Sequence, residues 1–161
     1  MKSMVVYSSE SGNTGLLAEA VYETLSSEKA IYPVGEAPQP NGSDLVAVGF
    51  WLQAGRPDPQ AQAYMKKIRK QKVFLFATHG AAVDSEHVRQ AMASARKLLP
   101  EADIIGQFNC QGRVNPKVLE KIAKKQPPPV WLADAPQADG HPDRNDRDRL
   151  QAMLKECLDS D

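Results

Sequence analysis

Cysteine is scarce in this chain. Only two cysteines occur in 161 residues, Cys110 and Cys157, and they lie far apart in the sequence. There is no C-x-x-C pair, and His79, His87 and His141 do not fall into a recognisable metal-binding pattern. The sequence therefore offers no disulfide framework and no metal motif, and we expect two reduced thiols.

Long apolar runs and an excess of charge are also missing. No apolar stretch approaches the roughly 18 residues of a membrane-spanning helix. Basic and acidic residues number 20 each, so the formal net charge is zero and gives no electrostatic case for nucleic acid. No signal-peptide pattern precedes the first apolar run. We expect a cytoplasmic protein with no membrane span, no nucleic-acid partner and no metal.

The most informative segment that the chain does contain is a hydroxyl-rich turn near its start. The turn follows the apolar run Met4-Val5-Val6-Tyr7 and precedes a helical pattern. The first N–H groups of a helix lack intrahelical acceptors and carry a partial positive charge, so they can bind a phosphate. Side-chain hydroxyls and a permissive glycine add to this anion site. The residues of the turn are Ser9, Glu10, Ser11, Gly12, Asn13 and Thr14.

Two familiar phosphate motifs do not fit this turn. A Walker loop ends in Gly-Lys-Ser/Thr, whereas Gly12 is followed by Asn13-Thr14 with no lysine. Hydrolysis of a nucleoside triphosphate is therefore not expected. A dinucleotide fingerprint needs three spaced glycines, which Gly12 and Gly15 do not supply. The turn instead resembles the FMN phosphate loop of the flavodoxin family, whose pattern is Ser/Thr-x-Ser/Thr-Gly-Asn/Thr-Thr.

Apolar runs and helical patterns alternate along the chain, which is typical of an α/β protein with a parallel sheet. Helical patterns begin after Gly12, at Asp58-Pro59, after Asp84, at Asn115-Pro116, and near Asn145 or Asp146. The fourth helix would bury Val118, Leu119, Ile122 and Ala123. The expected strands are Met4–Ser8, Ala30–Val34, Leu45–Phe50, Val73–Ala77 and Ile104–Phe108.

This pattern predicts a flavodoxin-like three-layer sandwich with a five-stranded parallel sheet in the order 2-1-3-4-5. Residues 35–43 are too short for a usual helical crossover, and we expect an extended strap there. We expect a single flavodoxin-like domain over residues 1–161, with a core at 1–114. A helical C-terminal part would follow at 115–161, with a proline-rich connection at 126–142 whose triple proline forms a stiff spacer.

Four segments should meet beyond the carboxyl ends of the strands, where ligands of such sheets bind. The resemblance to flavodoxins covers about residues 1–114 and implies one bound FMN, held by the phosphate loop and three further loops. Trp51 would stack on the flavin ring, unless it packs under its own loop. The further binding residues that the resemblance implies are Leu52, Gln53, Ala54, Gly55, Thr78, His79, Gly80, Ala81, Cys110, Gln111 and Gly112.

The loop after the fourth strand departs from the family. Typical flavodoxins carry a Tyr there, but residues 78–84 contain no aromatic side chain. Either His79 takes part of that role or one flavin face is open. His79 could equally donate a hydrogen bond near the flavin or face solvent. Trp51 is the only aromatic expected near the flavin, and Trp131 should lie away from it.

Three functions remain open at this point. The resemblance implies an FMN-binding electron-transfer protein that passes electrons between a reductase and a partner enzyme. A dedicated partner is expected, because a neutral chain would attract basic partners only weakly over long range. The alternatives are an FMN-dependent NAD(P)H or quinone reductase, and a flavin-free binding module. No catalytic residue is expected from the protein itself, since the cofactor performs the chemistry. Whether the chain is itself an enzyme, and its oligomeric state, are left open.

Overall fold

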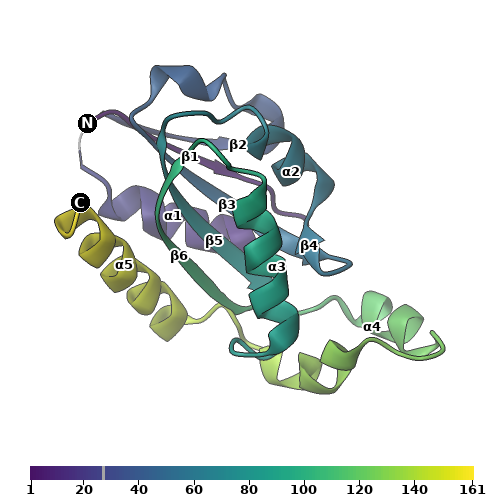
Figure 1. Ribbon diagram of the computed structural model, residues 1–161. Helices are drawn as coiled ribbons and strands as arrows, with labels where there is room; N and C mark the ends of the chain where they lie inside the picture. The colour runs from purple at the N-terminus through teal and green to yellow at the C-terminus, as the bar shows by residue number, and fades with distance from the viewer. Residues whose placement is uncertain (27) are drawn as a thin grey trace.

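A central sheet of five parallel strands organises the molecule (Figure 1). The computed structural model describes residues 1–26 and 28–161. The strand order is β2-β1-β3-β5-β6, which is the predicted 2-1-3-4-5 order of parallel strands. The strands are β1 (Ser3–Tyr7), β2 (Lys29–Pro33), β3 (Leu45–Gln53), β5 (Lys72–His79) and β6 (Asp103–Gln111).

One strand was not predicted. β4 (Arg56–Pro57) pairs antiparallel with the end of β3, Gln53 opposite Arg56. Ala54 and Gly55 join the two strands with φ of 52° and 73°. Positive φ at both central residues is the conformation of the tight two-residue hairpin that matches strand twist. β3, the central strand, therefore extends beyond its predicted end at Phe50 and carries a small hairpin at its carboxyl end.

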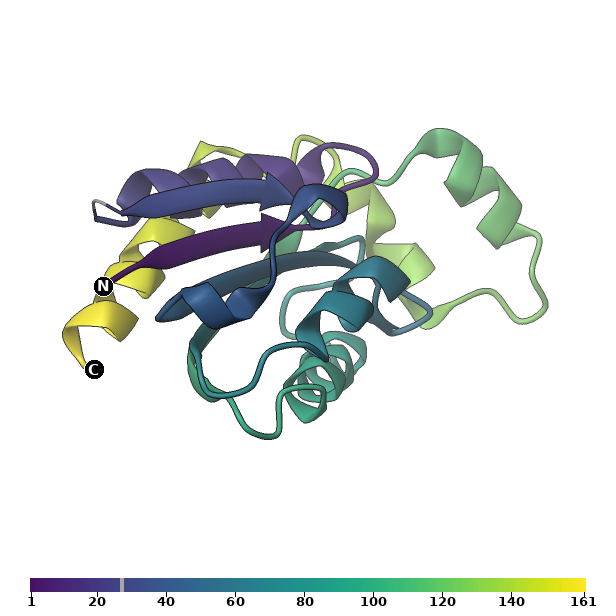
Figure 2. The same ribbon diagram turned by 90° about the horizontal axis from the view of Figure 1, so that it is seen from above.

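Helices cover both faces of the sheet (Figure 2). α1 (Asn13–Thr24) and α5 (Arg144–Asp159) pack against one face of the sheet, and their buried side chains include Leu17 and Leu150. α2 (Pro59–Met65) and α3 (Glu86–Lys97) cover the other. Strands covered on both sides read as continuous apolar runs, as β3 and β5 do here. The predicted three-layer arrangement is therefore confirmed.

The helix starts follow from side-chain caps. The Asp58 carboxylate accepts the N–H of Ala61 at the start of α2, and the Ser85 hydroxyl accepts that of Val88 at α3. α5 begins earlier than the predicted Asn145 or Asp146, because Asp143 caps it. The predicted strap at 35–43 contains no α-helix, but it is coiled by 3-10 turns at Val34–Glu36 and Pro40–Gly42.

Residues 114–131, called the arm below, extend beyond the carboxyl ends of the strands (Figure 2). The arm contains α4 (Pro116–Ala123) and ends where the 3-10 helix η3 (Val130–Ala138) begins. α4 starts at the predicted cap, Asn115, but the predicted buried face is wrong: none of its residues is buried, and Val118 is 43 % exposed. The helix reaches past the sheet and has no neighbouring layer to bury against. No helix in the described part of the chain is long and apolar enough to span a membrane.

Candidate functional site

A cavity of about 550 Å³ opens at the carboxyl edge of the sheet. The strand register aligns the ends that form it, because Trp51 on β3 lies opposite Thr78 on β5, and Thr78 opposite Cys110 on β6. Its volume is in the range of small-molecule sites. Fourteen of the eighteen predicted binding residues line it: Glu10, Ser11, Asn13, Thr14, Trp51, Leu52, Gln53, Ala54, Gly55, Thr78, His79, Gly80, Ala81 and Gly112.

The N-terminus of α1 forms one side of this cavity. Its N-cap residue, Gly12, has a φ of 93° and makes no side-chain cap. The Ser9 hydroxyl instead accepts the N–H of Gly15 at 3.2 Å. The first two helical residues, Asn13 and Thr14, line the cavity, and their N–H groups precede any possible intrahelical acceptor. This geometry suits an anion.

Two hydrogen bonds join the α1 loop to neighbouring strands. The Thr14 and Thr78 hydroxyls lie 2.9 Å apart and are buried. The Asn13 amide donates to the Arg113 carbonyl at 3.0 Å, just after β6. A Cβ at Gly112 would lie 2.6 Å from that amide nitrogen, so the two loops meet closely. The loop is therefore positioned by the sheet before any ligand arrives.

Trp51 is held at the cavity by the buried Asp58. The Asp58 carboxylate accepts the Trp51 N–H at 3.3 Å, and the Asp58 N–H donates to the Trp51 carbonyl at 3.0 Å. The same carboxylate accepts the Ser8 hydroxyl at 2.6 Å. Asp58 is thus the expected helix cap, and it also fixes the end of β3, which carries the indole.

His79 does not face solvent, so that alternative is wrong: only 8 % of it is exposed. Its Nε2 lies 2.8 Å from the Asn109 side-chain oxygen, while its buried Nδ1 has no hydrogen-bond partner in the described structure. Burial lowers the pKa of His79, which favours the neutral ring. A buried nitrogen without a partner is costly. Because His79 lines the cavity, a ligand hydrogen bond would remove that cost.

Four predicted binding residues do not line the cavity: Ser9, Gly12, Cys110 and Gln111. Cys110 is fully buried in the core on the α1 and α5 side, and burial raises the pKa of its thiol. Gln111 Nε2 donates to the Asp134 carbonyl at 3.4 Å and so contacts η3. Alternation explains the Cys110 result, because successive strand residues point to opposite faces of a sheet.

The arm was missed as part of the site. Trp131, expected to lie away from the flavin, lines the cavity with Trp51, so Trp51 is not the only nearby aromatic. The sequence signal for this part of the site was the four-residue spacing of Val114, Val118 and Ile122, which places the three apolar side chains on one side of the chain. Arg113 directly follows the predicted residues Cys110, Gln111 and Gly112 and belongs to the same expected segment. The lining residues outside the predicted segments are His87, Val114, Asn115, Val118, Ile122, Lys125, Pro129 and Trp131.

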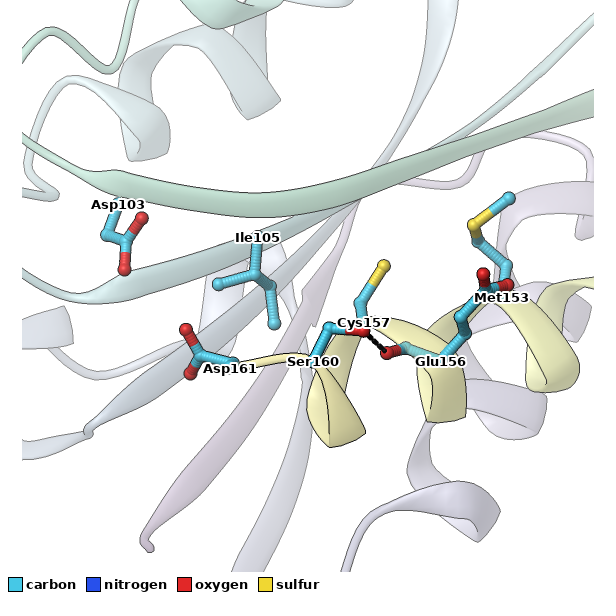
Figure 3. A pocket seen from close by; sticks show the side chains of 7 residues that line it. All are labelled: Asp103, Ile105, Met153, Glu156, Cys157, Ser160 and Asp161. Carbon is cyan, nitrogen blue, oxygen red and sulfur yellow. Dashed lines mark hydrogen bonds between the residues drawn. The ribbon is translucent and has the colours of Figure 1, made fainter.

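Two other features of the molecule have the outline of a site but lack its chemistry. A cavity of about 280 Å³ lies between the start of β6 and the end of α5 (Figure 3). It includes Asp103 and Asp161 and is at the amino edge of the sheet, away from the strand ends where such folds bind ligands. It has no side chain from the phosphate loop.

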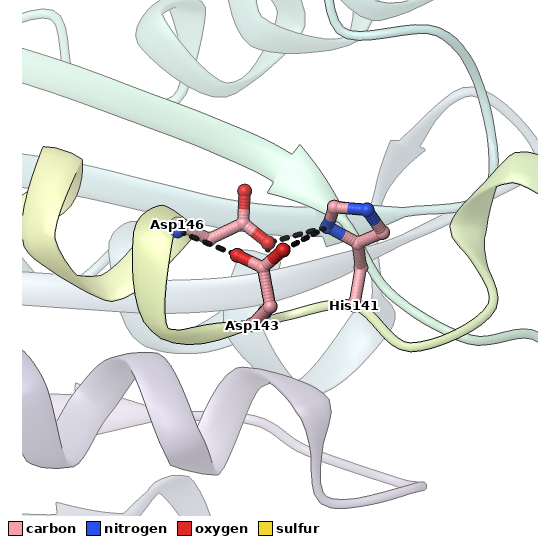
Figure 4. Close-up of side chains that lie close together, drawn as sticks. All are labelled: His141, Asp143 and Asp146. Atoms are coloured by element: carbon pink, nitrogen blue, oxygen red, sulfur yellow. Dashed lines mark hydrogen bonds and ion pairs between the residues drawn. The ribbon is translucent and has the colours of Figure 1, made fainter.

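The second is the group His141, Asp143 and Asp146 (Figure 4), whose ligand atoms lie within 4.8 Å of one another. These contacts are accounted for without a metal. Asp143 and Asp146 form a capping box at α5, and Asp146 also pairs with His141 Nδ1 at 2.6 Å and with Arg149 at 2.8 Å.

The sequence is similar to those of known proteins. A family model described as a flavodoxin domain matches residues 4–155. A flavodoxin-like domain-containing protein BilS from Clostridioides difficile (strain CD3) is 31 % identical over 119 residues, covering 71 % of this chain and 68 % of that protein.

Solved structures agree on the fold. Oxidised flavodoxin 2 from Bacillus cereus has a TM-score of 0.67 at 15 % identity and covers both chains fully. A flavoprotein in complex with FMN from Lactobacillus acidophilus NCFM has a TM-score of 0.53 at 16 % identity, covering 76 % of this chain and 99 % of that one.

Proposed function

The chain belongs to the flavodoxin family, and we propose that it binds FMN in the 550 Å³ cavity and transfers electrons to a partner protein. The observation that carries the proposal is the meeting of three features in one cavity. These are a helix N-terminus whose first two N–H groups have no intrahelical acceptor, an indole at the fixed end of β3, and a buried imidazole nitrogen without a partner. Each matches a different part of FMN: phosphate, flat ring and polar ring edge.

The phosphate would be held by the α1 N-terminus, with Ser11, Asn13 and Thr14. These donors are neutral, and the helix dipole favours the anionic group. Arg113 and Lys125 also line the cavity, but the Arg113 guanidinium pairs with Asp139 at 3.2 Å. The absence of a dinucleotide fingerprint in the loop supports FMN over FAD.

The ring would lie against Trp51, and His79 Nδ1 would hydrogen-bond its polar edge. Bound FMN supplies one- and two-electron redox chemistry, and the chain binds, orients and shields it. The Thr14–Thr78 and Asp58–Trp51 hydrogen bonds position these contacts in advance, which reduces the entropy lost on binding.

The partners would be a reductase that delivers electrons and an acceptor enzyme. The net charge of zero gives weak long-range steering, so short-range complementarity near the cavity would select the partner. A dedicated partner fits these conditions better than many exchangeable ones.

A direct FMN-dependent reductase of NAD(P)H or a quinone is the second candidate. One observation favours it: the apolar side chains of Val118 and Ile122 extend the cavity beyond the loops expected to hold FMN. Room beside the ring could admit a small substrate.

Anaerobic turnover tests the carrier proposal. FMN-loaded protein is mixed with NADH or NADPH, with and without a flavodoxin reductase, and flavin absorbance is followed. A carrier is reduced only when the reductase is present. Multiple turnovers with nicotinamide and quinone alone would instead establish the reductase, and failure to bind any flavin would leave the binding module.

A further inference from the structure

We infer that Trp131 provides a second aromatic contact for the FMN ring, replacing the aromatic residue that the loop after β5 lacks. This inference rests on the proposed function, because it concerns the same cavity and ligand. It assigns a binding role to the arm, which lies outside the part of the chain from which the flavin loops were predicted. The structural basis is the contact between Trp131 and Gly80.

The indole of Trp131 lies directly on the loop after β5. A Cβ at Gly80 would be 3.2 Å from Cζ3 and 3.3 Å from Cε3 of Trp131, and 2.6 Å from Cγ2 of Val114. A side chain at position 80 would therefore compete with the indole for space. The loop has no aromatic residue of its own, but the ring of Trp131, from the arm, lies against it.

The position of Trp131 is fixed from the body of the protein. The half-buried ring packs against the core cluster on the α2 and α3 side. Ala135 and Ala138, further along η3, are buried, and the Asp134 carbonyl accepts from Gln111. Its neighbour Val130 is 82 % exposed and does not line the cavity. Successive residues thus point in different directions, and the indole is the one directed to the cavity.

Trp51 and Trp131 reach the same cavity from different elements. Trp51 comes from the end of β3, and Trp131 covers the loop after β5, the neighbouring strand. A flat conjugated ring is well suited to contact with an indole face or edge. We expect Trp131→Ala to weaken FMN affinity by roughly twofold to tenfold, the size of one lost aromatic contact.

Fluorescence of the bound flavin tests the inference. An indole in contact with an excited flavin quenches it by electron transfer, which acts only at short range, whereas phenylalanine is a poor electron donor. FMN-loaded wild type is compared with Trp51→Phe, Trp131→Phe and the double variant. We expect each single variant to emit more than wild type, and the double variant to emit more than either. Val130→Ala, an exposed neighbour, is the matched control and should match wild type.

The outcomes separate the two proposals. Wild type that binds no FMN overturns the proposed function, and this inference with it. Wild type that binds FMN, with Trp131→Phe leaving emission unchanged in both backgrounds and Trp131→Ala leaving affinity unchanged, overturns the inference alone. If Trp131→Phe fails to fold, Trp131→Leu in the Trp51→Phe background provides the test, since it removes the indole but keeps an apolar side chain. Its flavin emission must then exceed that of Trp51→Phe, and unchanged emission contradicts the inference.

Discussion

The cavity is built from two regions that differ in how they are held. The loops at the strand ends are fixed by buried hydrogen bonds, such as Thr14 to Thr78 and Ser8 to Asp58. The arm has no buried residue in α4, and Trp131 at its end provides the contact with the core. The strand-end loops therefore form a preorganised half of the site, whereas α4, which has no buried residue, forms a half that can move at lower cost between its fixed ends at Val114 and Trp131. Cofactor affinity should depend chiefly on the first half, and access to the ring on the second.

Truncation of a buried side chain should show the largest difference in stability between the two regions. Phe76→Ala removes a fully buried ring from β5 and should destabilise the protein by about 3–5 kcal/mol. Val118→Ala, in the arm, should change the free energy of unfolding by no more than about 0.5 kcal/mol. Urea unfolding of the apoprotein measures both. A loss above about 1.5 kcal/mol at Val118 would mean that the arm folds as part of the core.

Removing phosphate-loop hydroxyls should have the next largest effect. Ser11→Ala should weaken FMN by about 1.5–3 kcal/mol, roughly tenfold or more, and barely affect riboflavin, which lacks the phosphate. Thr14→Ala should do the same and also destabilise the apoprotein, because Thr78 loses its buried partner. Calorimetric titration with both ligands gives the affinities, and Thr14→Ser is the control that keeps the hydroxyl. Equal losses for FMN and riboflavin would show that these hydroxyls do not contact phosphate.

The junction between η3 and α5 should give a smaller, pH-dependent effect. Burial of the Asp146 carboxylate, the largest influence, raises its pKa, but hydrogen bonds from Asp143, His141 and Arg149 together hold the pKa below its usual value. A lowered folded pKa stabilises the native state above the unfolded pKa of about 3.9, and this contribution is lost as pH falls through the folded pKa.

Asp146→Asn should therefore be less stable than wild type at pH 7, with the difference shrinking below about pH 4. Urea midpoints measured across this range check it. A difference that stays constant with pH would assign the effect to packing, and the charge would then play no part.

The two regions also differ in how far the sequence predicts them. The strand-end loops were predictable because apolar runs locate the strands, and parallel strands bring their carboxyl ends to one edge. This reasoning placed Trp51 and His79 correctly at the cavity. It failed for Cys110, where the strand runs on and side-chain alternation turns the thiol into the core.

The arm could not be predicted by the same logic. The helical period correctly gave α4 and its Asn115 cap, but periodicity does not say whether an apolar face meets a core or a cavity. The path of the chain after the triple proline determines where Trp131 lies, and that path depends on long-range contacts such as Gln111 to Asp134. Gly80 was the other sequence signal, since the space left by its missing side chain is occupied in part by Trp131, about fifty positions later.

Direct identification of the cofactor tests the central claim. Protein is purified, any bound flavin is released and identified by mass, and the apoprotein is titrated with FMN, FAD and riboflavin. We expect FMN to be recovered, and FMN to bind at least roughly tenfold more tightly than riboflavin because only FMN presents a phosphate to the α1 N-terminus. Recovery of FAD, equal affinity for FMN and riboflavin, or no flavin binding after reconstitution would contradict the account.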